Sequence, residues 1–390
     1  MRVYDVVIVG AGAAGLCLAR RLLTLGGVSV ALVDGARDDD ALRSYSAWRS
    51  RPSTLDALVR HRWSRVSVVD AEGRSRAVEM TEHRYETLFF AELQREVKEG
   101  LARDPAHRVV EGLAGEVREG GDGVEVDVEG EVIRGRWLFD SRFRRAELSV
   151  EARRWHLLWQ RFAGWVVRAD RDVFDPTTVT LFDFRVDAPA GTAFVYVLPF
   201  GPREALVELV SLRPIDVDAA LTGYLRDALG LDAGSWVVTA REAGSSPMTE
   251  GPFTARRGAR TRTIGIPAGR LKPSTGYALT RIEEDAERVA LAVVEGRDPC
   301  AEPPSRALYR WLDGVFLELW SREPWVVPSV FAALLRPGRV DRALRFLDER
   351  ASAWDLAVIV STLPLWPFAR AALRWAWRRL GGVAVSVGDP

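Results

Sequence analysis

Apolar and polar positions near the start of the chain follow a strand, turn, helix, strand pattern. The apolar, β-branched run Tyr4–Val9 predicts a buried parallel strand. A glycine-rich turn, Gly10-Ala11-Gly12-Ala13-Ala14-Gly15, follows it, and residues 16–25 have the spacing of a helix. A second apolar run, residues 28–33, predicts the next strand and ends in Asp34. This order is typical of a βαβ unit that binds a dinucleotide.

Five positions of this unit have distinct expected roles. Gly10 takes the backbone angles of the turn, Gly12 lets a pyrophosphate approach the main chain, and Gly15 lets the helix pack closely on the strand. The N–H groups at the helix N-terminus, near Ala13, attract the phosphates. Asp34, about 20 positions after the glycines, is placed to accept a hydrogen bond from a ribose hydroxyl. Because the unit opens the chain, we expect FAD rather than NAD.

Residues 35–142 mix polar segments with short periodic ones. Glu86–Leu101 has the apolar spacing of a helix that packs on the nucleotide-binding sheet. Residues 109–133 alternate with period two around Gly-Gly-Asp-Gly and Glu-Gly turns, which predicts a β-meander. The apolar run 137–139 ends in Asp140. We expect this strand to rejoin the parallel sheet, with Asp140 near the nucleotide.

The middle of the chain predicts an antiparallel sheet that forms one wall of a substrate cavity. A helix is expected over Ala219–Gly230, within this series of strands. Residues 263–269 predict a last strand of the nucleotide-binding sheet and a glycine turn with Gly265 and Gly269, before a helix near 277–294. The expected strands of the antiparallel sheet are Phe162–Ala169, Val179–Val186, Ala193–Leu198, Ala205–Leu212 and Trp236–Arg241.

The predicted fold class is α/β, a Rossmann-type FAD-binding fold as in two-domain flavoproteins, with an inserted antiparallel-sheet domain and a C-terminal helical region. The nucleotide-binding part is expected in two pieces, residues 1–150 and 256–302. Residues 151–255 form the substrate-binding sheet. Residues 303–390 form the helical region, which prolines divide into short pieces.

Composition excludes several classes of function. With 54 basic and 54 acidic residues, the chain has no net charge that would attract nucleic acid. Two cysteines, Cys17 and Cys300, exclude a disulfide framework and favour a reducing, cytoplasmic setting. Four histidines lie far apart without metal-ligand spacing, so we expect no metal site. The chain begins directly with a core strand, so we expect no targeting peptide.

Tryptophan is concentrated in the C-terminal third, among arginines. Tryptophan with arginine suits a membrane interface, where the rings lie at headgroup level and the cations meet lipid phosphate. The longest uncharged run, Leu356–Ala369, has 14 residues, fewer than the roughly 20 that a spanning helix needs. We therefore expect peripheral membrane contact, with a helical cap on the flavin domain as the alternative. The tryptophans concerned are Trp311, Trp320, Trp325, Trp354, Trp366, Trp375 and Trp377.

Short motifs over most of the chain together resemble the FAD-dependent lycopene cyclase family, of the bacterial lycopene β-cyclase type. The motifs are Phe139-Asp140-Ser141-Arg142, Trp159-Gln160-Arg161-Phe162-Ala163-Gly164-Trp165, Phe174-Asp175-Pro176, Leu181-Phe182-Asp183-Phe184-Arg185, Leu198-Pro199-Phe200, Ala205-Leu206-Val207-Glu208, Pro247-Met248-Thr249, Lys272-Pro273-Ser274-Thr275-Gly276-Tyr277 and Leu363-Pro364-Leu365-Trp366-Pro367-Phe368.

Three stretches depart from the pattern of that family. Its Phe-Leu-Glu-Glu-Thr motif falls on Leu206-Val207-Glu208-Leu209-Val210, which keeps the first glutamate and lacks the second acid and the threonine. Its His-x-Trp element appears as Ser46-Ala47-Trp48. The turn Gly265-Ile266-Pro267-Ala268-Gly269 replaces the commoner Gly-Thr-Ala-Gly. A mechanism with two adjacent carboxylates is therefore not expected here.

The resemblance implies cyclisation of the acyclic ends of lycopene to β-ionone rings, which gives γ- or β-carotene with no net redox change. Reduced FAD would be the active cofactor and NAD(P)H its reductant. Glu208, a lone carboxyl in an apolar strand, would be the acid that protonates the alkene. Pro273, Ser274, Thr275 and Gly276 would meet the flavin, and Ser274 or Thr275 could cap the helix that follows.

Several residues have a structural interpretation beside the functional one. Glu208 could be a water-facing glutamate on an edge strand. Asp183 and Arg185 could form a structural salt bridge rather than act in catalysis. Five aromatic side chains could line a tunnel for the polyene or fill the core; they are Trp165, Phe182, Phe184, Tyr196 and Phe200.

Three other functions remain open from the sequence. A protein with the same fold could be a flavin monooxygenase or other redox enzyme, or a geranylgeranyl-reductase-like enzyme that saturates isoprenoid alkenes. It could also be a non-enzymatic protein that binds FAD or carries a carotenoid. The sequence leaves open whether one or both ends are closed, which ring forms, whether Glu208 or the reduced flavin gives the first proton, which nicotinamide cofactor serves, and the oligomeric state.

Overall fold

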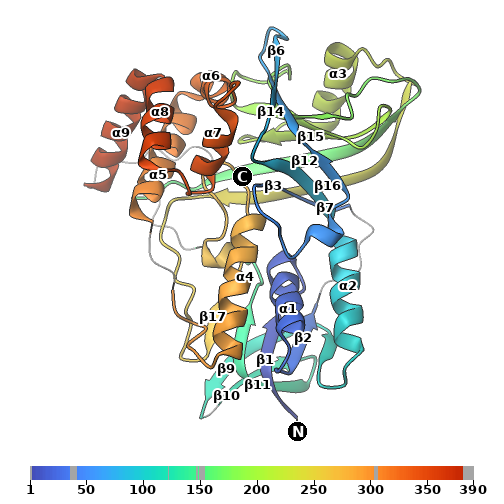
Figure 1. Ribbon diagram of the computed structural model, residues 1–390, viewed down its shortest axis with the longest axis vertical. Helices are drawn as coiled ribbons and strands as arrows, with labels where there is room; N and C mark the ends of the chain where they lie inside the picture. The colour runs from blue at the N-terminus through green and yellow to red at the C-terminus, as the bar shows by residue number, and fades with distance from the viewer. Residues whose placement is uncertain are drawn as a thin grey trace.

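The computed structural model describes residues 2–35, 42–121, 123–145, 148, 154–302 and 306–380. Figure 1 shows a lower half with a partly parallel sheet and its helices, and an upper half with a mostly antiparallel sheet. The C-terminal helices stand beside the upper sheet at one side of the molecule. The predicted boundaries near 150 and 302 fall at or beside undescribed residues, and the domain limits remain a prediction.

The first sheet is the predicted nucleotide-binding sheet, and its strand order is β8-β2-β1-β11-β10-β9 with β17 on β11. Strand β1 runs parallel to β2 and to β11, so the strand that ends in Asp140 rejoins the sheet as expected. Residues 108–111 pair parallel with β2, whereas the sequence placed 109–110 in the meander. The strands are β1 (Val3–Val9), β2 (Val30–Asp34), β8 (Arg108–Glu111), β9 (Ala114–Gly120), β10 (Gly123–Val128), β11 (Glu131–Asp140) and β17 (Thr261–Thr263).

Three helices cover one face of this sheet, and α1 lies between the other two (Figure 1). Their apolar sides share one core with β1 and β2. The helix predicted over Glu86–Leu101 begins later, because residues 84–89 form a strand that pairs with β3. Cross-strand pairing has overridden the helical spacing at these positions. The helices are α1 (Ala13–Leu25), α2 (Phe90–Ala102) and α4 (Leu279–Val294).

The second sheet has the order β16-β12-β15-β14-β13-β5-β6, and the five strands predicted for the substrate domain are all in it. Strands β5 and β6 come from the first 150 residues, and β5 pairs parallel with β13. Helix α3 (Val217–Leu229) covers the face away from the first sheet. The strands are β5 (Arg65–Val69), β6 (Ser75–Glu79), β12 (Leu158–Ala169), β13 (Thr178–Asp183), β14 (Ala193–Pro199), β15 (Glu204–Ser211) and β16 (Trp236–Met248).

A small sheet, β3-β7-β4, joins the two halves of the molecule. It consists of β3 (Ser44–Arg49), β4 (His61–Trp63) and β7 (Arg84–Phe89), with a short helical turn, η1 (Asp56–Leu58), between β3 and β4. The N–H of Leu42, just before β3, donates to the carbonyl of Arg241 in β16. The start of β3 is therefore held against the edge of the second sheet.

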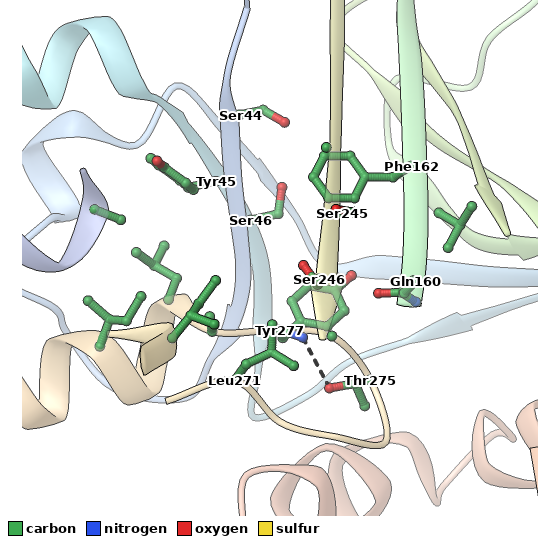
Figure 2. Close-up of a pocket in the computed structure, with 18 of the residues that line it drawn as sticks. Ser44, Tyr45, Ser46, Gln160, Phe162, Ser245, Ser246, Leu271, Thr275 and Tyr277 are labelled. Carbon is green, nitrogen blue, oxygen red and sulfur yellow. Dashed lines mark hydrogen bonds between the residues drawn. The ribbon is translucent and has the colours of Figure 1, made fainter. Parts of the chain in front are cut away.

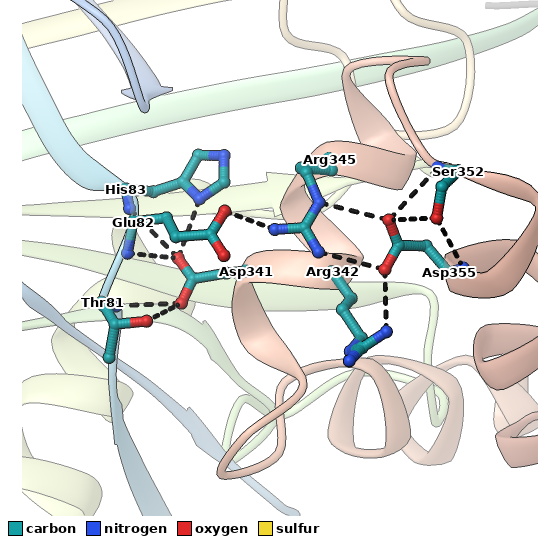
Figure 3. Close-up of polar contacts among 8 residues, drawn as sticks. All are labelled: Thr81, Glu82, His83, Asp341, Arg342, Arg345, Ser352 and Asp355. Atoms are coloured by element: carbon teal, nitrogen blue, oxygen red, sulfur yellow. Dashed lines mark hydrogen bonds and ion pairs between the residues drawn. The ribbon is translucent and has the colours of Figure 1, made fainter.

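The C-terminal helices are fixed to the second sheet through Asp341 (Figure 3). Its carboxylate accepts hydrogen bonds from the Thr81 N–H and hydroxyl and from the His83 ring, at 2.8–2.9 Å. Burial alone would raise the pKa of Asp341, but these contacts lower it to about 2. The elements are α5 (Ala307–Arg322), η4 (Pro324–Val326), α6 (Val327–Leu334), α7 (Val340–Leu347), α8 (Ala353–Thr362) and α9 (Leu365–Arg379).

Candidate functional site

A cavity of about 470 Å³ lies where the glycine turn meets the second sheet. Figure 2 shows part of its wall, with β3 on one side, β12 and β16 on the other, and the loop 271–277 below them. Gly12, Ala13 and Ala14 line the end toward the first sheet. The cavity therefore connects the expected cofactor motif to the sheet that was expected to bind substrate.

The glycine turn has the backbone geometry that the sequence predicts. Gly10 has φ +95°, a left-handed conformation that glycine adopts without strain. A Cβ on Gly15 would lie 2.0 Å from the Gly10 carbonyl oxygen, so glycine is required for the close packing of α1. A Cβ on Gly12 would meet no atom of the described residues within 4 Å. Space is therefore left beside the N-terminal N–H groups of α1, where a phosphate would be attracted.

Asp34 lies at the carboxyl end of β2, where the motif places its acidic residue. Its carboxylate is buried and binds the ammonium of Lys98 at 2.9 Å and the amide of Gln94 at 3.3 Å, both from α2. A ribose hydroxyl at this position would share the carboxylate with Lys98. Its role in binding ribose remains a prediction.

Asp140 does not line this cavity. Its carboxylate binds the guanidinium of Arg142 at 2.7 Å, beside a separate hollow on the other side of the sheet end. Gly265, with φ +75°, lines the cavity, and a Cβ there would lie 2.7 Å from the Cβ of Ala14. Gly269, with φ +72°, instead packs against the ring of Phe253. The structure thus brings Gly265 to the glycine turn, while Asp140 and Gly269 do not line this cavity and their roles at the cofactor stay predictions.

The loop 272–277 forms a tight turn at the edge of the cavity. The N–H of Gly276 donates to the carbonyl of Lys272, and Ser274, Thr275 and Gly276 line the cavity while Pro273 does not. The Thr275 hydroxyl accepts from the N–H of Tyr277 at 3.3 Å (Figure 2). The prediction that Ser274 or Thr275 caps the following helix is wrong, because α4 begins at Leu279 with residue 278 at its N-cap.

The C-terminal helices hold this loop in place. The ammonium of Lys272 is buried and lies 2.8 Å from the carboxylate of Asp313 in α5 and 3.0 Å from that of Glu349 after α7. Burial raises the pKa of Asp313, and the charge of Lys272 opposes that shift. The helical region therefore sets the position of the loop that was expected to meet the flavin.

Glu208 lies on the wall of the cavity, in the interior of the second sheet. Strand β15 has β12 on one side and β14 on the other, so the alternative of an edge-strand glutamate facing water is excluded. Positions 206 and 210 point to the same face as Glu208, while 205, 207 and 209 pack beneath α3. Alternation along the strand therefore directs Glu208 into the cavity.

Glu208 is not a lone carboxyl, which corrects the prediction from the sequence. Glu242 of β16 shares a hydrogen bond with it. Ser44 of β3 donates to Glu242 through its N–H at 2.7 Å and its hydroxyl at 2.9 Å. Burial raises the pKa of Glu208 well above its ordinary value, and the charge of Glu242 raises it further. Burial also raises the pKa of Glu242, but the bonds from Ser44 and Glu208 oppose that shift. Glu208 is thus the member that carries the proton.

Sequence reasoning missed Glu242 because the predicted strand ended at Arg241. In the structure β16 continues to Met248, so Glu242 occupies an ordinary inward position of a long strand. Trp236 and Val238 pack under α3, and a register shift between Val238 and Ala240 moves the later positions to the cavity face. A simple period-two extension of the predicted strand would therefore have placed Glu242 on the wrong face.

Three tyrosine hydroxyls form a chain beside Glu208. Tyr196 of β14 lies directly across from Glu208, and its hydroxyl bonds to that of Tyr85. The Tyr85 hydroxyl in turn lies 2.6 Å from that of Tyr277. Burial raises the pKa of all three phenols, so they are neutral. The ring of Tyr277 also packs on Trp48 with centroids 4.5 Å apart.

Aromatic side chains line much of the remaining wall. Of the five aromatics that the sequence singled out, Phe182 and Tyr196 reach the cavity. Trp165 stacks on Trp236 in the core under α3 and Phe200 stacks on His61, while Phe184 packs in the core on the cavity side of the sheet. Phe182 stacks on Phe331 of α6 with ring centroids 3.9 Å apart. The other aromatics that line the cavity are Tyr45, Phe143, Phe162, Phe194, Tyr277, Trp320 and Phe331.

Two other groups have structural roles. Asp183 binds Arg185 at 2.6 Å and accepts from the Tyr224 hydroxyl at 2.8 Å, away from the cavity, so the structural interpretation of this pair is confirmed. His156 lies between the carboxylates of Glu250 and Glu318, at 2.8 Å from each. Among the residues that the structure describes, no group of His, Cys, Asp and Glu could hold a metal ion.

The predicted fold class is confirmed, because the structure has the same fold as solved flavin-dependent oxidoreductases and halogenases. A geranylgeranyl bacteriochlorophyll reductase-like protein from Thermoplasma acidophilum aligns over 95% of this chain and 98% of its own, at 15% identity and a TM-score of 0.61. The flavin-dependent brominase Bmp2 aligns over 92% and 98%, at 16% identity and 0.62. A flavoprotein/dehydrogenase from Cytophaga hutchinsonii aligns over 96% and 99%, at 14% identity and 0.61.

The sequence assigns the chain more narrowly within this class. The family model described as lycopene cyclase protein matches residues 5–373, nearly the whole chain. The protein belongs to the lycopene cyclase family, as its motifs indicate.

Proposed function

We propose that the protein cyclises the acyclic ends of lycopene to β-ionone rings in a redox-neutral isomerisation. The observation that carries the proposal is the position of Glu208, a carboxyl held in its protonated form on the wall of an aromatic-lined cavity. An alkene is a very weak base, so its protonation requires an acid that is shielded from water and fixed in place. Glu208 meets both conditions.

Reduced FAD is the proposed cofactor, with NAD(P)H as its reductant. The space beside Gly12 and the N-terminal N–H groups of α1 would take the pyrophosphate, and Ser274, Thr275 and Gly276 would meet the flavin. When bound, the reduced flavin would supply an electron-rich surface beside the cationic end group. The residues present therefore fit the cofactor, with Gly12 as the clearest sign.

The side chains of the cavity would act on the end group in order. Glu208 gives its proton to the terminal double bond, a neighbouring double bond attacks the tertiary cation and closes the ring, and loss of a proton leaves the cyclic alkene. Proton gain and proton loss balance, and no electrons are consumed. The faces of Phe182 and Phe194 would stabilise the cation as aromatic rings stabilise other cations, by roughly 0.5–2 kcal/mol each.

This mechanism predicts how NAD(P)H is used. Purified protein with lycopene should form many rings per NAD(P)H oxidised under anaerobic conditions, because the reductant serves to reduce the flavin and is not consumed by ring closure. Pigment chromatography and nicotinamide absorbance measure the two quantities together. Equal amounts of ring and oxidised cofactor would contradict the isomerase and support a reductase; hydroxylated product in air would support a monooxygenase.

We also propose that the protein is cytoplasmic and meets the membrane through its C-terminal helices, since lycopene does not diffuse through water. We take the exposed apolar side chains of η4, α8 and α9 as the proposed membrane face, which includes Trp366 at 70% and Trp377 at 68% exposure. In the described residues no single helix is long and apolar enough to span a bilayer. Helices α8 and α9, which are bent by 108° relative to each other, reach that length and apolar composition only when they are taken together. The face consists of Trp325, Trp354, Leu365, Trp366, Leu373 and Trp377.

Several arginines of this region also have partners within the protein. Arg370 and Arg374 bind the carboxylate of Glu323, and Arg378 binds that of Glu318 at 3.2 Å, so these arginines serve internal contacts. Trp320 and Trp375 point inward and donate to Gly191 and Glu250. The exposed tryptophans and the two leucines therefore supply most of the proposed membrane contact.

Membrane binding through this face is testable with vesicles. The double variant Trp366→Ser/Trp377→Ser should bind phosphatidylglycerol–phosphatidylethanolamine vesicles about a hundredfold more weakly or worse, because each ring buried in the membrane contributes roughly 1.5–3 kcal/mol. Sedimentation with vesicles measures the bound fraction. Leu113→Ser/Val237→Ser removes two exposed apolar side chains elsewhere, at 70% and 57% exposure, and should bind like the wild type. Equal binding by both double variants would place the membrane contact on another surface.

A further inference from the structure

A glycine separates the two carboxyls of the cavity wall. Gly164 of β12 pairs with Glu208 of β15 on one side and with Glu242 of β16 on the other. The three residues thus form one row across adjacent strands, which lie about 4.8 Å apart. Side chains in one row of a sheet point to the same face, so both carboxyls project above Gly164.

The absence of a side chain at position 164 is what lets these carboxyls meet. A Cβ on Gly164 would lie 3.2 Å from the Cβ of Glu208 and 3.3 Å from its Oε2. It would also lie 2.8 Å from Cδ1 of Leu206, so a side chain here would crowd Glu208 from the strand that lies between it and Glu242. In the next row of the same two strands, Phe162 of β12 pairs with Gly244 of β16, and the ring of Phe162 lies over Gly244. The wall therefore has one gap in which two acids share a proton.

We propose that Glu242 is the positioning residue that keeps the reacting proton on Glu208, and that Gly164 provides the gap through which it does so. The inference rests on the proposed function. Glu242 is fixed by the N–H and hydroxyl of Ser44 and accepts from Glu208. These bonds favour its ionised form, and an ionised neighbour favours the protonated form of Glu208.

The pair also matches the charge that develops in the reaction. When Glu208 has given its proton to the alkene, two carboxylates face the cation, and their repulsion favours the return of a proton to Glu208 when the ring alkene forms. Groups that face the pair are Tyr196 from β14 and Tyr277 from the loop, both neutral, and Ser44 from β3. The guanidinium of Arg43 lies over the ring of Phe90 instead. The two glutamates therefore titrate as a coupled pair, and the pKa values of the site are those of the pair.

Glu242→Gln should move the pH dependence of the reaction. Without the neighbouring charge the pKa of Glu208 falls, so the alkaline limb of the kcat/KM profile should shift to lower pH by about one unit or more. A role of Glu242 in folding alone would lower the rate equally at all pH values. Gly164→Ala keeps both acids but crowds the carboxyl of Glu208, so it should weaken the contact with Glu242 and shift the profile in the same direction. Gly120→Ala, at a strand glycine whose Cβ meets no described atom within 4 Å, should leave the profile unchanged.

Infrared spectroscopy tests the pair without any turnover. Protein labelled with ¹³C-glutamate should show a protonated carboxyl band that persists above neutral pH, disappears in Glu208→Gln, and titrates at lower pH in Glu242→Gln and Gly164→Ala. A band unaffected by both of the latter changes, or an unshifted pH profile, would overturn the inference. If the infrared result holds while no lycopene is cyclised, the carboxyl pair stands and the proposed function fails.

Discussion

Glu208→Gln is expected to lower the rate of ring formation by roughly 10²–10⁴-fold, the usual effect of removing a general acid–base catalyst. The amide has nearly the shape of the protonated acid and can still donate to Glu242, so the sheet and the flavin content should be unchanged. The amide cannot give up a proton to an alkene. Extracts of a lycopene-accumulating host with this variant should remain red, whereas the wild type yields cyclic carotenoid.

Glu204→Gln is the matched control for this experiment. Glu204 lies on the same strand, outside the cavity, and pairs with Arg168 at the surface. Exposed pairs of this kind contribute about 0–1 kcal/mol, so this variant should cyclise lycopene like the wild type. If Glu208→Gln keeps its flavin and still forms rings at a wild-type rate, the initiating proton comes from the reduced flavin or another group.

The parts of the site that sequence reasoning predicted correctly are set by residues that are close together in the sequence. Gly10, Gly12 and Gly15 are separated by a few positions, and their backbone roles follow from the turn itself. The strand that ends in Asp140 was predicted for the same reason, since one apolar run defines it. The inward direction of Glu208 follows from alternation along a single strand.

The parts that were missed depend on pairing between distant strands. Glu208 meets Glu242 because residues 164, 208 and 242 share one row, and nothing in a single segment specifies that register. The aromatic wall likewise requires Phe331 of α6 to reach Phe182 of β13. The ion pair that the carboxylate of Asp140 makes with Arg142 was not predicted either, and the role of Asp140 at the cofactor stays a prediction. Local patterns could not show these tertiary contacts.

Gly12→Val should give a folded protein that has lost most of its flavin. The backbone at Gly12 is extended, with φ −79° and ψ −177°, so valine causes no strain. Its Cβ would meet no atom of the described residues within 4 Å, so the protein itself has room for a side chain there. The same space is where the pyrophosphate must approach the main chain of α1.

The amount of flavin that copurifies with this variant tests whether the pyrophosphate binds beside Gly12. A loss of about 1.4 kcal/mol in binding free energy already weakens binding tenfold, so the purified variant should be nearly colourless. Near-ultraviolet circular dichroism checks that it is folded. Gly201→Val, at another glycine whose Cβ meets no described atom within 4 Å, should stay yellow. A full flavin complement in Gly12→Val would show that the phosphates bind elsewhere, because a branched side chain and a pyrophosphate cannot occupy the same space at the N-terminus of α1.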